Sequence, residues 1–205
     1  MAGRTRVDHA VVSGTFSLDG ETFDVDNNIW VVGDDDECAV IDAPHSVEAI
    51  LDVVAGRKVK AILLTHAHDD HCRVAPALRE AVVAPIFLHP DDKPLWELTH
   101  TDHLWDLDLP DGWELEVGGT TLRTLHTPGH APGGCCFYAP DLECVFTGDT
   151  LFQGGPGATG RSYSDRPTLE ESIRAKLFAL PDETVVHTGH GDDTTIGAER
   201  ADLSG

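Results

Sequence analysis

The chain has 205 residues, 40% of them hydrophobic, and its 14 basic and 36 acidic side chains give a formal charge of −22 at pH 7. We expect residues 1–205 to form a single domain, because a chain of this size and composition can bury a substantial core. The negative charge excludes nucleic acid and anionic membrane surfaces as expected partners, because both are bound mainly through Lys and Arg.

The sequence carries no membrane or targeting signal. No stretch reaches the roughly 18 apolar residues that span a bilayer. The arginines near the N-terminus are not followed by an apolar segment of the kind that marks a secretory signal. We therefore expect a cytoplasmic protein with a small-molecule substrate, and a homodimer stays open.

Apolar runs predict strands at 10–12, 29–32 and 38–41. The segment 46–56 (SVEAILDVVAG) predicts a helix that Ser46 caps and Gly56 ends, with an apolar stripe along one side. Residues 59–65 (VKAILLT) are typical of a strand that is buried on both faces. A helix over 72–84 and a strand at 85–89 are expected to follow.

The second half begins with a charged connector at 91–112, followed by predicted strands at 115–117, 121–124, 136–138 and 144–147. A glycine-rich loop (154–160) leads to a helix over 167–180, where Thr168 and Glu171 predict a capping box. Residues 184–191 (TVVHTGHG) are expected to close the folded part. Strands with helices before and after them in each half predict two β layers covered by outer helices.

The five cysteines are expected to be reduced and mostly buried, because none forms a C-x-x-C pair. Cys135 and Cys136 are adjacent and should face opposite sides of a strand. A metal-binding role stays open for Cys72, which directly follows a histidine cluster.

That cluster, THAHDDH at 65–71, follows an apolar strand. In an extended segment His66 and His68 face the same side, which suits one metal ion. Asp70 and His71 come where the chain should turn into a helix, so they point elsewhere and could serve a second ion. Asp69 is expected to cap that helix, which leaves Asp70 as the ligand.

Three further segments each end a strand with a ligand-type residue. HTPGH (126–130) presents His130, VFTGDT (145–150) presents Asp149, and HTGHG (187–191) presents His190. A site at one rim of a β scaffold would use residues placed in this way.

The ordered set THAHDDH, TPGH, GDT and GHG resembles the metallo-β-lactamase superfamily, and within it the glyoxalase II-like group. The resemblance spans residues 28–191 and implies an α/β fold, the four-layer αββα sandwich, with metals at the edge between its sheets. It implies a first ion on three histidines, a second on one aspartate and two histidines, and a bridging aspartate. These residues are His66, His68 and His130, then Asp70, His71 and His190, and finally Asp149.

The implied cofactor is two divalent metal ions. Zinc is the first expectation, and iron or manganese also suits nitrogen and oxygen ligands. Two such ions lower the pKa of a water between them, so that hydroxide can attack a carbonyl near neutral pH. Asp70 and Asp149 are the expected catalytic carboxylates. Asp149 also argues against a true β-lactamase, because the zinc β-lactamases commonly place Cys or Ser there.

Other polar residues have open roles. Asp42 either orients a metal-binding histidine or forms a turn. The loop 152–167 is expected to contact substrate through Arg161 and Tyr163, with Arg166 beside them, or else to be a flexible surface loop. Backbone hydrogen bonds are expected for His126 and His187, a place beside the cleft for His45 and His89, and a surface position for His9, His100 and His103.

The leading hypothesis is a hydrolase that cleaves a thioester of a low-molecular-weight thiol. Only fifteen residues follow His190, so the C-terminal helical domain that holds glutathione in glyoxalase II is not expected and the thiol stays open. The alternatives are a persulfide dioxygenase with a single iron on two histidines and one aspartate, a lactonase, and a non-catalytic metal-binding module.

Overall fold

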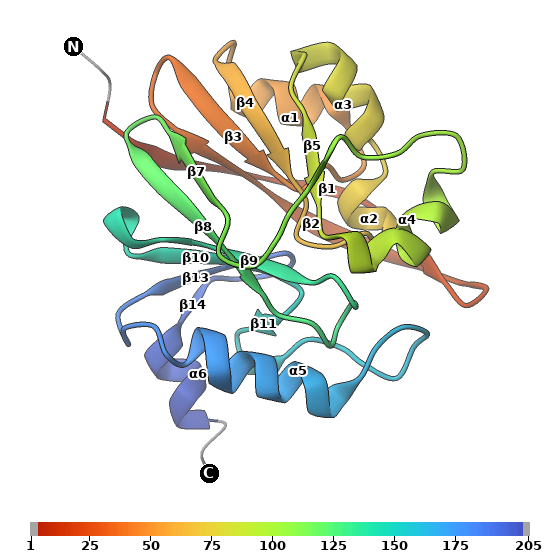
Figure 1. The fold of residues 1–205 in the computed structure, drawn as a ribbon, viewed down its shortest axis with the longest axis vertical. Coiled ribbons are helices and arrows are strands. Elements are labelled where there is room, and N and C mark those ends of the chain that lie inside the picture. Colours follow the sequence, from red (N-terminus) through yellow and green to blue (C-terminus); the bar gives the residue numbers. More distant parts are fainter. Residues whose placement is uncertain (1–3, 203–205) are drawn as a thin grey trace.

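Two sheets of six strands each form the centre of the protein, a computed structural model of which describes residues 4–202 (Figure 1). In spatial order the first sheet contains β1 (Arg6–Leu18), β2 (Glu21–Gly33), β3 (Glu37–Ile41), β4 (Lys58–Leu63), β5 (Ile86–Leu88) and β6 (Leu107–Asp108). The second contains β14 (Thr194–Thr195), β13 (Val185–Thr188), β10 (Cys144–Gly148), β9 (Cys135–Ala139), β8 (Thr120–His126) and β7 (Glu114–Val117). A separate two-stranded ribbon pairs β11 (Leu151–Phe152) with β12 (Gly155–Pro156).

Helices cover the outer faces of both sheets. On the first sheet these are α1 (Val47–Val54), α2 (Asp69–Cys72), α3 (Ala75–Val82) and α4 (Lys93–Thr99), with the 3₁₀ turn η1 (Pro90–Asp92) before α4. On the second they are α5 (Arg166–Ser172), continued by the π-helical turn η3 (Ile173–Leu177), and α6 (Ile196–Asp202). A short 3₁₀ turn, η2 (Pro140–Leu142), joins β9 to β10. The predicted four-layer αββα sandwich is confirmed.

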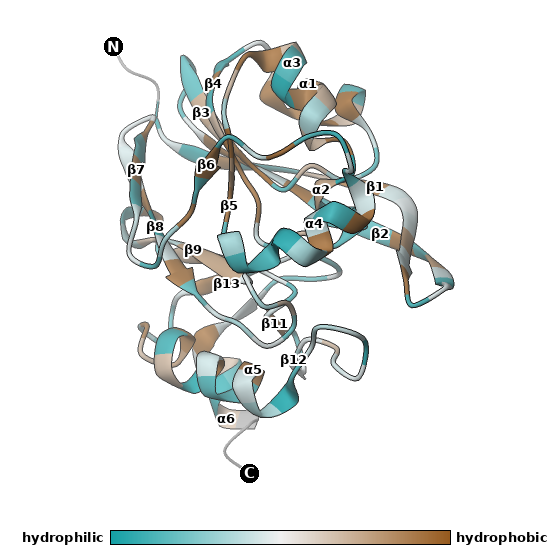
Figure 2. Ribbon diagram, turned by 45° about the vertical axis from the view of Figure 1, so that its right-hand side comes forward, coloured by the Kyte–Doolittle hydropathy of each residue, from teal (hydrophilic) through white to brown (hydrophobic). Residues whose placement is uncertain are grey.

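Three apolar contact layers hold these elements together, because side chains alternate across each strand. On β2, Ile29 and Val31 pack with the first set of helices, whereas Trp30 and Val32 face the second sheet. Figure 2 shows hydrophobic residues along the inner strands and hydrophilic residues on the outward side of α4. The second sheet alternates in the same way, so that it packs against the first sheet on one face and against α5, η3 and α6 on the other.

The helix expected over 72–84 is divided in two. The helical turn α2 begins earlier, at Asp69, and α3 starts only at Ala75. Val74 at the junction has φ −101° and ψ 10°, outside the helical range. The expected capping box is also wrong, because Asp165 caps α5 by accepting from the Thr168 backbone N–H at 2.9 Å.

Two segments contain more regular structure than their sequence predicted. The charged connector at 91–112 holds α4, whose Leu95 and Trp96 are buried in the core. The folded part continues past residue 191, because β14 pairs with β13 and α6 follows it. Ile196 is fully buried against the second sheet, and this contact holds the last helix in place.

The five cysteines are all buried and unpaired, as expected. Cys135 and Cys136 face different contact layers. Cys72 donates to the Ala67 carbonyl, and burial raises the pKa of its thiol well above the usual value, so it is an inert thiol. Among the described helices, none combines the length and the apolar character needed to cross a membrane.

Phe137 tests the layer between the sheets, where it is fully buried on β9. We expect Phe137→Ala to lower the free energy of unfolding by about 3–5 kcal/mol, because it leaves a cavity between two rigid sheets. Chemical denaturation measures the loss. Leu104→Ala is the control, since Leu104 is 69% exposed and should change stability by less than about 0.5 kcal/mol. Equal losses in the two variants would contradict this packing.

Candidate metal centre

The predicted ligand residues all lie where strands end at one edge of the two sheets. His66 and His68 follow β4, and Asp70 and His71 lie on the turn α2 behind them. The other three come from the second sheet, at the ends of β8, β10 and β13: His130, Asp149 and His190. The two sheets meet face to face, so segments far apart in the sequence deliver their side chains to the same place (Figure 1).

The first group consists of His66, His68 and His130, and one ligand atom from each lies within 4.8 Å of the others. The His68 Nδ1 and His130 Nε2 atoms are 3.0 Å apart. His130 donates from its outer Nδ1 to the Ala158 carbonyl at 2.8 Å, which leaves the lone pair on its inner Nε2. This is the arrangement that nitrogen ligation of one ion requires.

His66 is oriented by a hydrogen-bond chain. Thr65 Oγ1 donates to Asp42 at 2.8 Å and therefore accepts from His66 Nδ1 at 3.0 Å. The inner nitrogen, His66 Nε2, is buried and has no hydrogen-bond partner among the described residues. An unpaired buried nitrogen is costly unless a cation fills the place in front of it, so the donor set fits a metal ion.

The second group consists of Asp70, His71 and His190. His71 donates from Nδ1 to Asp42 at 2.8 Å, and His190 donates from Nδ1 to the Asp26 carbonyl at 2.7 Å. Their Nε2 atoms then face each other at 3.3 Å, with Asp70 Oδ2 at 3.2 Å from His190 Nε2 and 3.6 Å from His71 Nε2. Three further ligand-type atoms therefore converge beside the first group.

Asp149 lies between the two groups. Its Oδ1 is 3.3 Å from His71 Nε2, and its Oδ2 is 3.6 Å from His130 Nε2 and 3.5 Å from His190 Nε2. Among the described residues, it is therefore the carboxylate placed to contact an ion in either group. Gly148 before it has φ 49°, and a Cβ at this residue would meet Thr65 Oγ1 at 2.5 Å, so only glycine lets the strand end here.

The two groups differ in their protonation. Burial lowers the pKa of His66 well below its usual value and that of His68 to about 3, so both rings are neutral at pH 7. Burial also opposes protonation of His190, but the charge of Asp149 outweighs it and raises the pKa of His190 to about 10. In the same way the charges of Asp149 and Asp70 overcome burial and raise the pKa of His71.

Both carboxylates of the centre stay ionised. Burial favours the neutral form of Asp70, but the positive charge on His71 outweighs it and lowers the pKa of Asp70 to about 2. His71 and His190 lower the pKa of Asp149 well below its usual value in spite of its burial. Protons on the two histidines thus balance the carboxylates where no cation does so.

The structure corrects the predicted role of Asp69 and supports one of the two predicted roles of Asp42. Asp69 is not the helix cap, because α2 begins at Asp69 and His68 takes the cap position without a side-chain bond. The Asp69 carboxylate instead pairs with Arg73 and accepts from the Ser17 backbone N–H at 3.1 Å, which ties α2 to β1. Asp42 orients His71, as one of its two predicted roles required.

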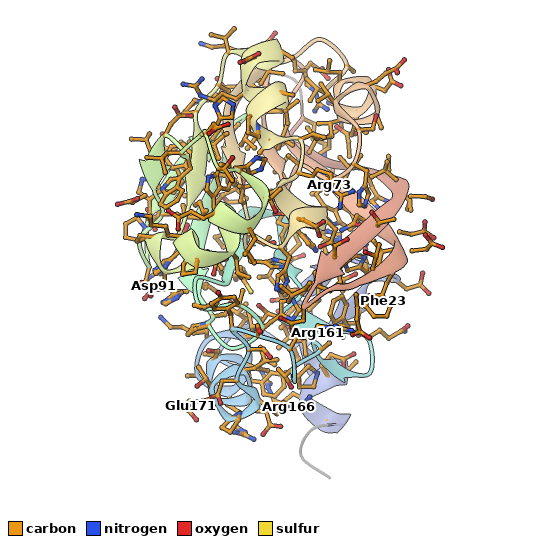
Figure 3. All side chains as sticks on the ribbon, turned by 90° about the vertical axis from the view of Figure 1, so that its right-hand side faces the viewer. Phe23, Arg73, Asp91, Arg161, Arg166 and Glu171 are labelled. Carbon is orange, nitrogen blue, oxygen red and sulfur yellow. The ribbon has the colours of Figure 1, made fainter. Side chains whose placement is uncertain are left out.

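A cavity of about 420 Å³ opens beside the centre. Its wall combines ligand candidates from both groups with apolar side chains, among them Phe16 and Phe152, and with the loop segment that carries Arg161. The Arg161 guanidinium lies 4.6 Å from the Phe23 ring and bonds Glu21 at 2.9 Å, so it reaches across to the β1–β2 hairpin (Figure 3).

Tyr163, which was expected to contact substrate, is not part of this wall; its side chain is 48% exposed. Arg166 instead pairs with Glu170 on α5.

Sequence reasoning missed two asparagines on β2. Asn27 is buried, and its Nδ2 donates to Asp70 Oδ2 at 3.1 Å, while its Oδ1 accepts from His45. Asn28 donates to the carbonyls of Thr188 and Gly191, which holds the loop that carries His190. The sequence signal for them was the pair of adjacent asparagines directly before the apolar run 29–32. Polar side chains next to a buried strand need hydrogen-bond partners, so such a pair indicates contacts within the protein.

The remaining histidines have structural contacts. His126 donates to the Pro132 carbonyl at 3.1 Å, as expected, whereas His187 bonds the Asp193 side chain rather than the backbone. His9 is exposed, as expected, and its ring stacks on Trp30. His100 is half-buried rather than a surface residue, and its ring lies tilted against Trp96. His103 is exposed, as expected.

The rings of His89 and His126 stack with their centroids 3.8 Å apart. Together with Asp91 they form a further group, outside the metal centre, that could hold an ion. There, however, the His89 Nδ1 atom already accepts from the Asp91 backbone N–H, and the Asp91 side chain is 62% exposed. Neither His89 nor His45 lines the cavity beside the centre.

Sequence comparison with known proteins identifies one superfamily and relatives named as hydrolases. A model of the metallo-beta-lactamase superfamily matches residues 22–190. Hydroxyacylglutathione hydrolase GloC of Haemophilus influenzae is 36% identical over 187 residues, which are 84% of this chain and 87% of that protein. Probable metallo-hydrolase YqgX of Bacillus subtilis is 36% identical over 192 residues, 84% of this chain and 89% of that protein.

Solved structures agree with the fold. The BLEG-1 B3 metallo-beta-lactamase has a TM-score of 0.79 at 30% identity, covering 93% of this chain and 97% of that one. TTHA1623 in a di-iron-bound form has a TM-score of 0.76 at 34% identity, covering 92% and 96%. ETHE1 from Myxococcus xanthus has a TM-score of 0.71 at 26% identity, covering 91% and 80%.

The two neighbouring aspartates should respond differently to substitution. Asp70→Ala is expected to reduce bound metal from about two ions per chain to about one, because it removes a carboxylate from the second group. Asp69→Ala is expected to keep both ions, because Asp69 contacts Arg73 and Ser17 instead. Elemental analysis of the purified proteins measures the ratio. Metal loss in Asp69→Ala with retention in Asp70→Ala would reverse the assignment.

Metal binding at pH 7.5 should release protons. His71 and His190 hold protons in the metal-free chain because their pKa values are raised, and both must lose them to ligate. His66 and His68 are already neutral and release none. Calorimetric titration with zinc in buffers of different ionisation enthalpy should therefore show up to about two protons released per chain. A binding enthalpy independent of the buffer would contradict this charge distribution.

Proposed function

Because this chain belongs to the metallo-beta-lactamase superfamily, we propose that it is a dinuclear metallo-hydrolase that cleaves a thioester of a low-molecular-weight thiol. The membership and the hydroxyacylglutathione hydrolase relatives establish a metal-dependent hydrolase in general. Thioester cleavage and the use of two ions are the parts that we propose.

The observation that carries the proposal is the position of Asp149. One carboxylate oxygen faces His71 and the other faces His130, so the two groups share it. A single-ion site would not need two complete sets of three inward-facing ligand-type residues on either side of one carboxylate. The di-iron form of TTHA1623, at 34% identity, supports the same reading.

The chain supplies ligands and orientation. His66, His68 and His130 would hold one ion, and Asp70, His71 and His190 the other. Such a pair of ions supplies a water of lowered pKa and a positive charge for the oxygen of the attacked carbonyl. Asp42 and the carbonyls of Asp26 and Ala158 fix the outer nitrogens of three of these histidines, and Asn27 donates to Asp70 Oδ2. Among the described residues of the cavity wall, the Ser and Cys side chains are limited to Ser162 and Ser164 on its outer loop.

The cavity wall supports a substrate with an apolar part and an anionic part. Phe16, Val25 and Phe152 offer apolar surface directly beside the centre. Apart from histidines, Arg161 is the one cationic side chain among the described residues of the wall. Its partner Glu21 is 63% exposed and can turn away into solvent. We assign Arg161 to the anionic part of the thioester, such as a carboxylate. The position of Tyr163 outside the wall gives its predicted contact with substrate no support.

A persulfide dioxygenase with one iron is the second candidate. Besides the second group, the centre contains another set in which two histidines and one carboxylate converge: His66, His71 and Asp149. The similarity to ETHE1 also covers 91% of this chain, although at lower identity than TTHA1623. Oxygen consumption with a persulfide and one iron per chain would favour this candidate.

Asp149→Ala tests the main proposal. We expect the rate of thioester hydrolysis to fall by more than about 100-fold, a larger loss than removal of a residue that only orients a ligand causes. The assay uses a panel of thioesters, a lactone, a β-lactam and a persulfide, with metal content measured in parallel. Asp102→Ala is the control, because Asp102 is an exposed carboxylate outside the site, and it should retain full activity.

Removal of metal completes the test. Dialysis against a chelator should abolish hydrolysis, and adding zinc, iron or manganese back should restore it. Thioester hydrolysis that survives complete removal of metal would overturn the proposal. Turnover of the β-lactam or the lactone with no turnover of any thioester would replace the substrate class and leave the metal chemistry in place.

A further inference from the structure

Asp92 is a fully buried carboxylate outside the ligand set, at the junction of η1 and α4. Its Oδ2 accepts from the Ala67 backbone N–H at 2.8 Å, and its Oδ1 accepts from the Gly133 backbone N–H. No basic side chain pairs with it among the residues that the structure describes. A carboxylate is buried in this way only where its hydrogen bonds offset the cost of desolvation.

The two N–H groups belong to the two loops that supply the first ligand group. Ala67 stands between His66 and His68 after β4, and Gly133 lies three residues beyond His130 between β8 and β9. These loops extend from different sheets. Apart from Asp92, the bond from the Cys135 N–H to the Thr65 carbonyl at 2.7 Å also links them.

Asp92 bonds the two loops instead of capping its own helix. Asp92 occupies the N-cap position of α4, where an aspartate normally accepts from the first turn of the helix. It makes no such bond. Its carboxylate points instead toward the neighbouring loops, so the local capping energy is given up for the tertiary contact.

Gly133 is shaped to receive this carboxylate. A Cβ at residue 133 would lie 2.9 Å from Asp92 Oδ1 and 2.8 Å from the Asp92 backbone nitrogen, closer than real Cβ contacts. On the other loop, the Ala67 carbonyl accepts from Cys72 while the Ala67 N–H is bound by Asp92, so both polar atoms of this peptide are engaged. The segment between His66 and His68 is thereby held from two sides.

We propose that Asp92 is a positioning residue that sets the spacing between the His66–His68 loop and the His130 loop, and so sets the metal affinity of the first group. This inference rests on the metal centre of the proposed function, although not on the thioester as substrate. The second group does not depend on Asp92, because Asp42, Asn27 and the Asp26 carbonyl orient it.

Asp92→Asn is the informative variant. Asparagine has nearly the same shape, but its amide NH₂ faces one of the two N–H donors, so one of the hydrogen bonds is lost. Burial raises the pKa of Asp92 to about 7, so the neutral carboxyl is already populated near pH 7 and a neutral amide is compatible with folding. Asp91→Asn is the matched control, because this neighbouring carboxylate is 62% exposed.

The readout is zinc affinity by competition with a chromogenic chelator, measured without substrate. In an Asp70→Ala background, which isolates the first group, we expect Asp92→Asn to weaken zinc binding by about 10–100-fold. In a His130→Ala background, which isolates the second group, we expect no change. Asp91→Asn should change neither. Gly133→Ala, which displaces the carboxylate from the opposite side, should reproduce the effect of Asp92→Asn.

The outcomes separate this inference from the proposed function. Unchanged affinity in the Asp70→Ala background, or equal weakening in both backgrounds, would overturn the positioning role. If Asp92→Asn fails to fold, Gly133→Ala decides the same question by the same criterion. A wild-type chain that binds no zinc would overturn the metal centre itself, whereas a chain that binds zinc but cleaves no thioester leaves the role of Asp92 intact.

Discussion

The constraint on which the structure depends is the convergence of five inward-facing imidazoles and two carboxylates that are buried or half-buried. Asp149 and Asp70 remain ionised there only because positive charge lies beside them. In the chain alone, His71 and His190 supply that charge by holding protons. Metal ions would take over the same electrostatic role and release the histidines as neutral ligands.

The surrounding fold keeps these side chains at fixed positions by holding their outer atoms. Each outer imidazole nitrogen with a partner bonds a backbone carbonyl or a buried polar side chain, as for His71 with Asp42 and His190 with the Asp26 carbonyl. Such contacts select the tautomer and aim the lone pair inward. Two tightly packed sheets make this possible, because loops from opposite sheets are brought to one edge without freedom to separate.

Metal chemistry and substrate choice are carried by different parts of the molecule. The ligand candidates lie at strand ends and on α2, which the sheets hold rigidly. The cavity wall, by contrast, comes largely from the long β1–β2 hairpin and from the loop after β12, and Arg161 joins these two segments through Glu21 and Phe23. Substitutions in these two segments can alter the substrate while the metal centre stays unchanged, because loops vary more readily than the scaffold that supports them.

The sequence by itself predicted the strands near the site and the residues at their ends, because strand-to-loop transitions and ligand spacing are local patterns. The resemblance of its ordered motifs to the superfamily implied the fold and the set of seven candidate ligands. The sequence did not reveal Asn27, Asn28 or Asp92, and it misplaced Asp69 as a helix cap. Asp92 would be assigned as an ordinary cap of α4 from its neighbours alone. Only the tertiary structure decided that its carboxylate binds Ala67 and Gly133, because those partners lie 25 and 41 residues away and meet it through packing of the two sheets.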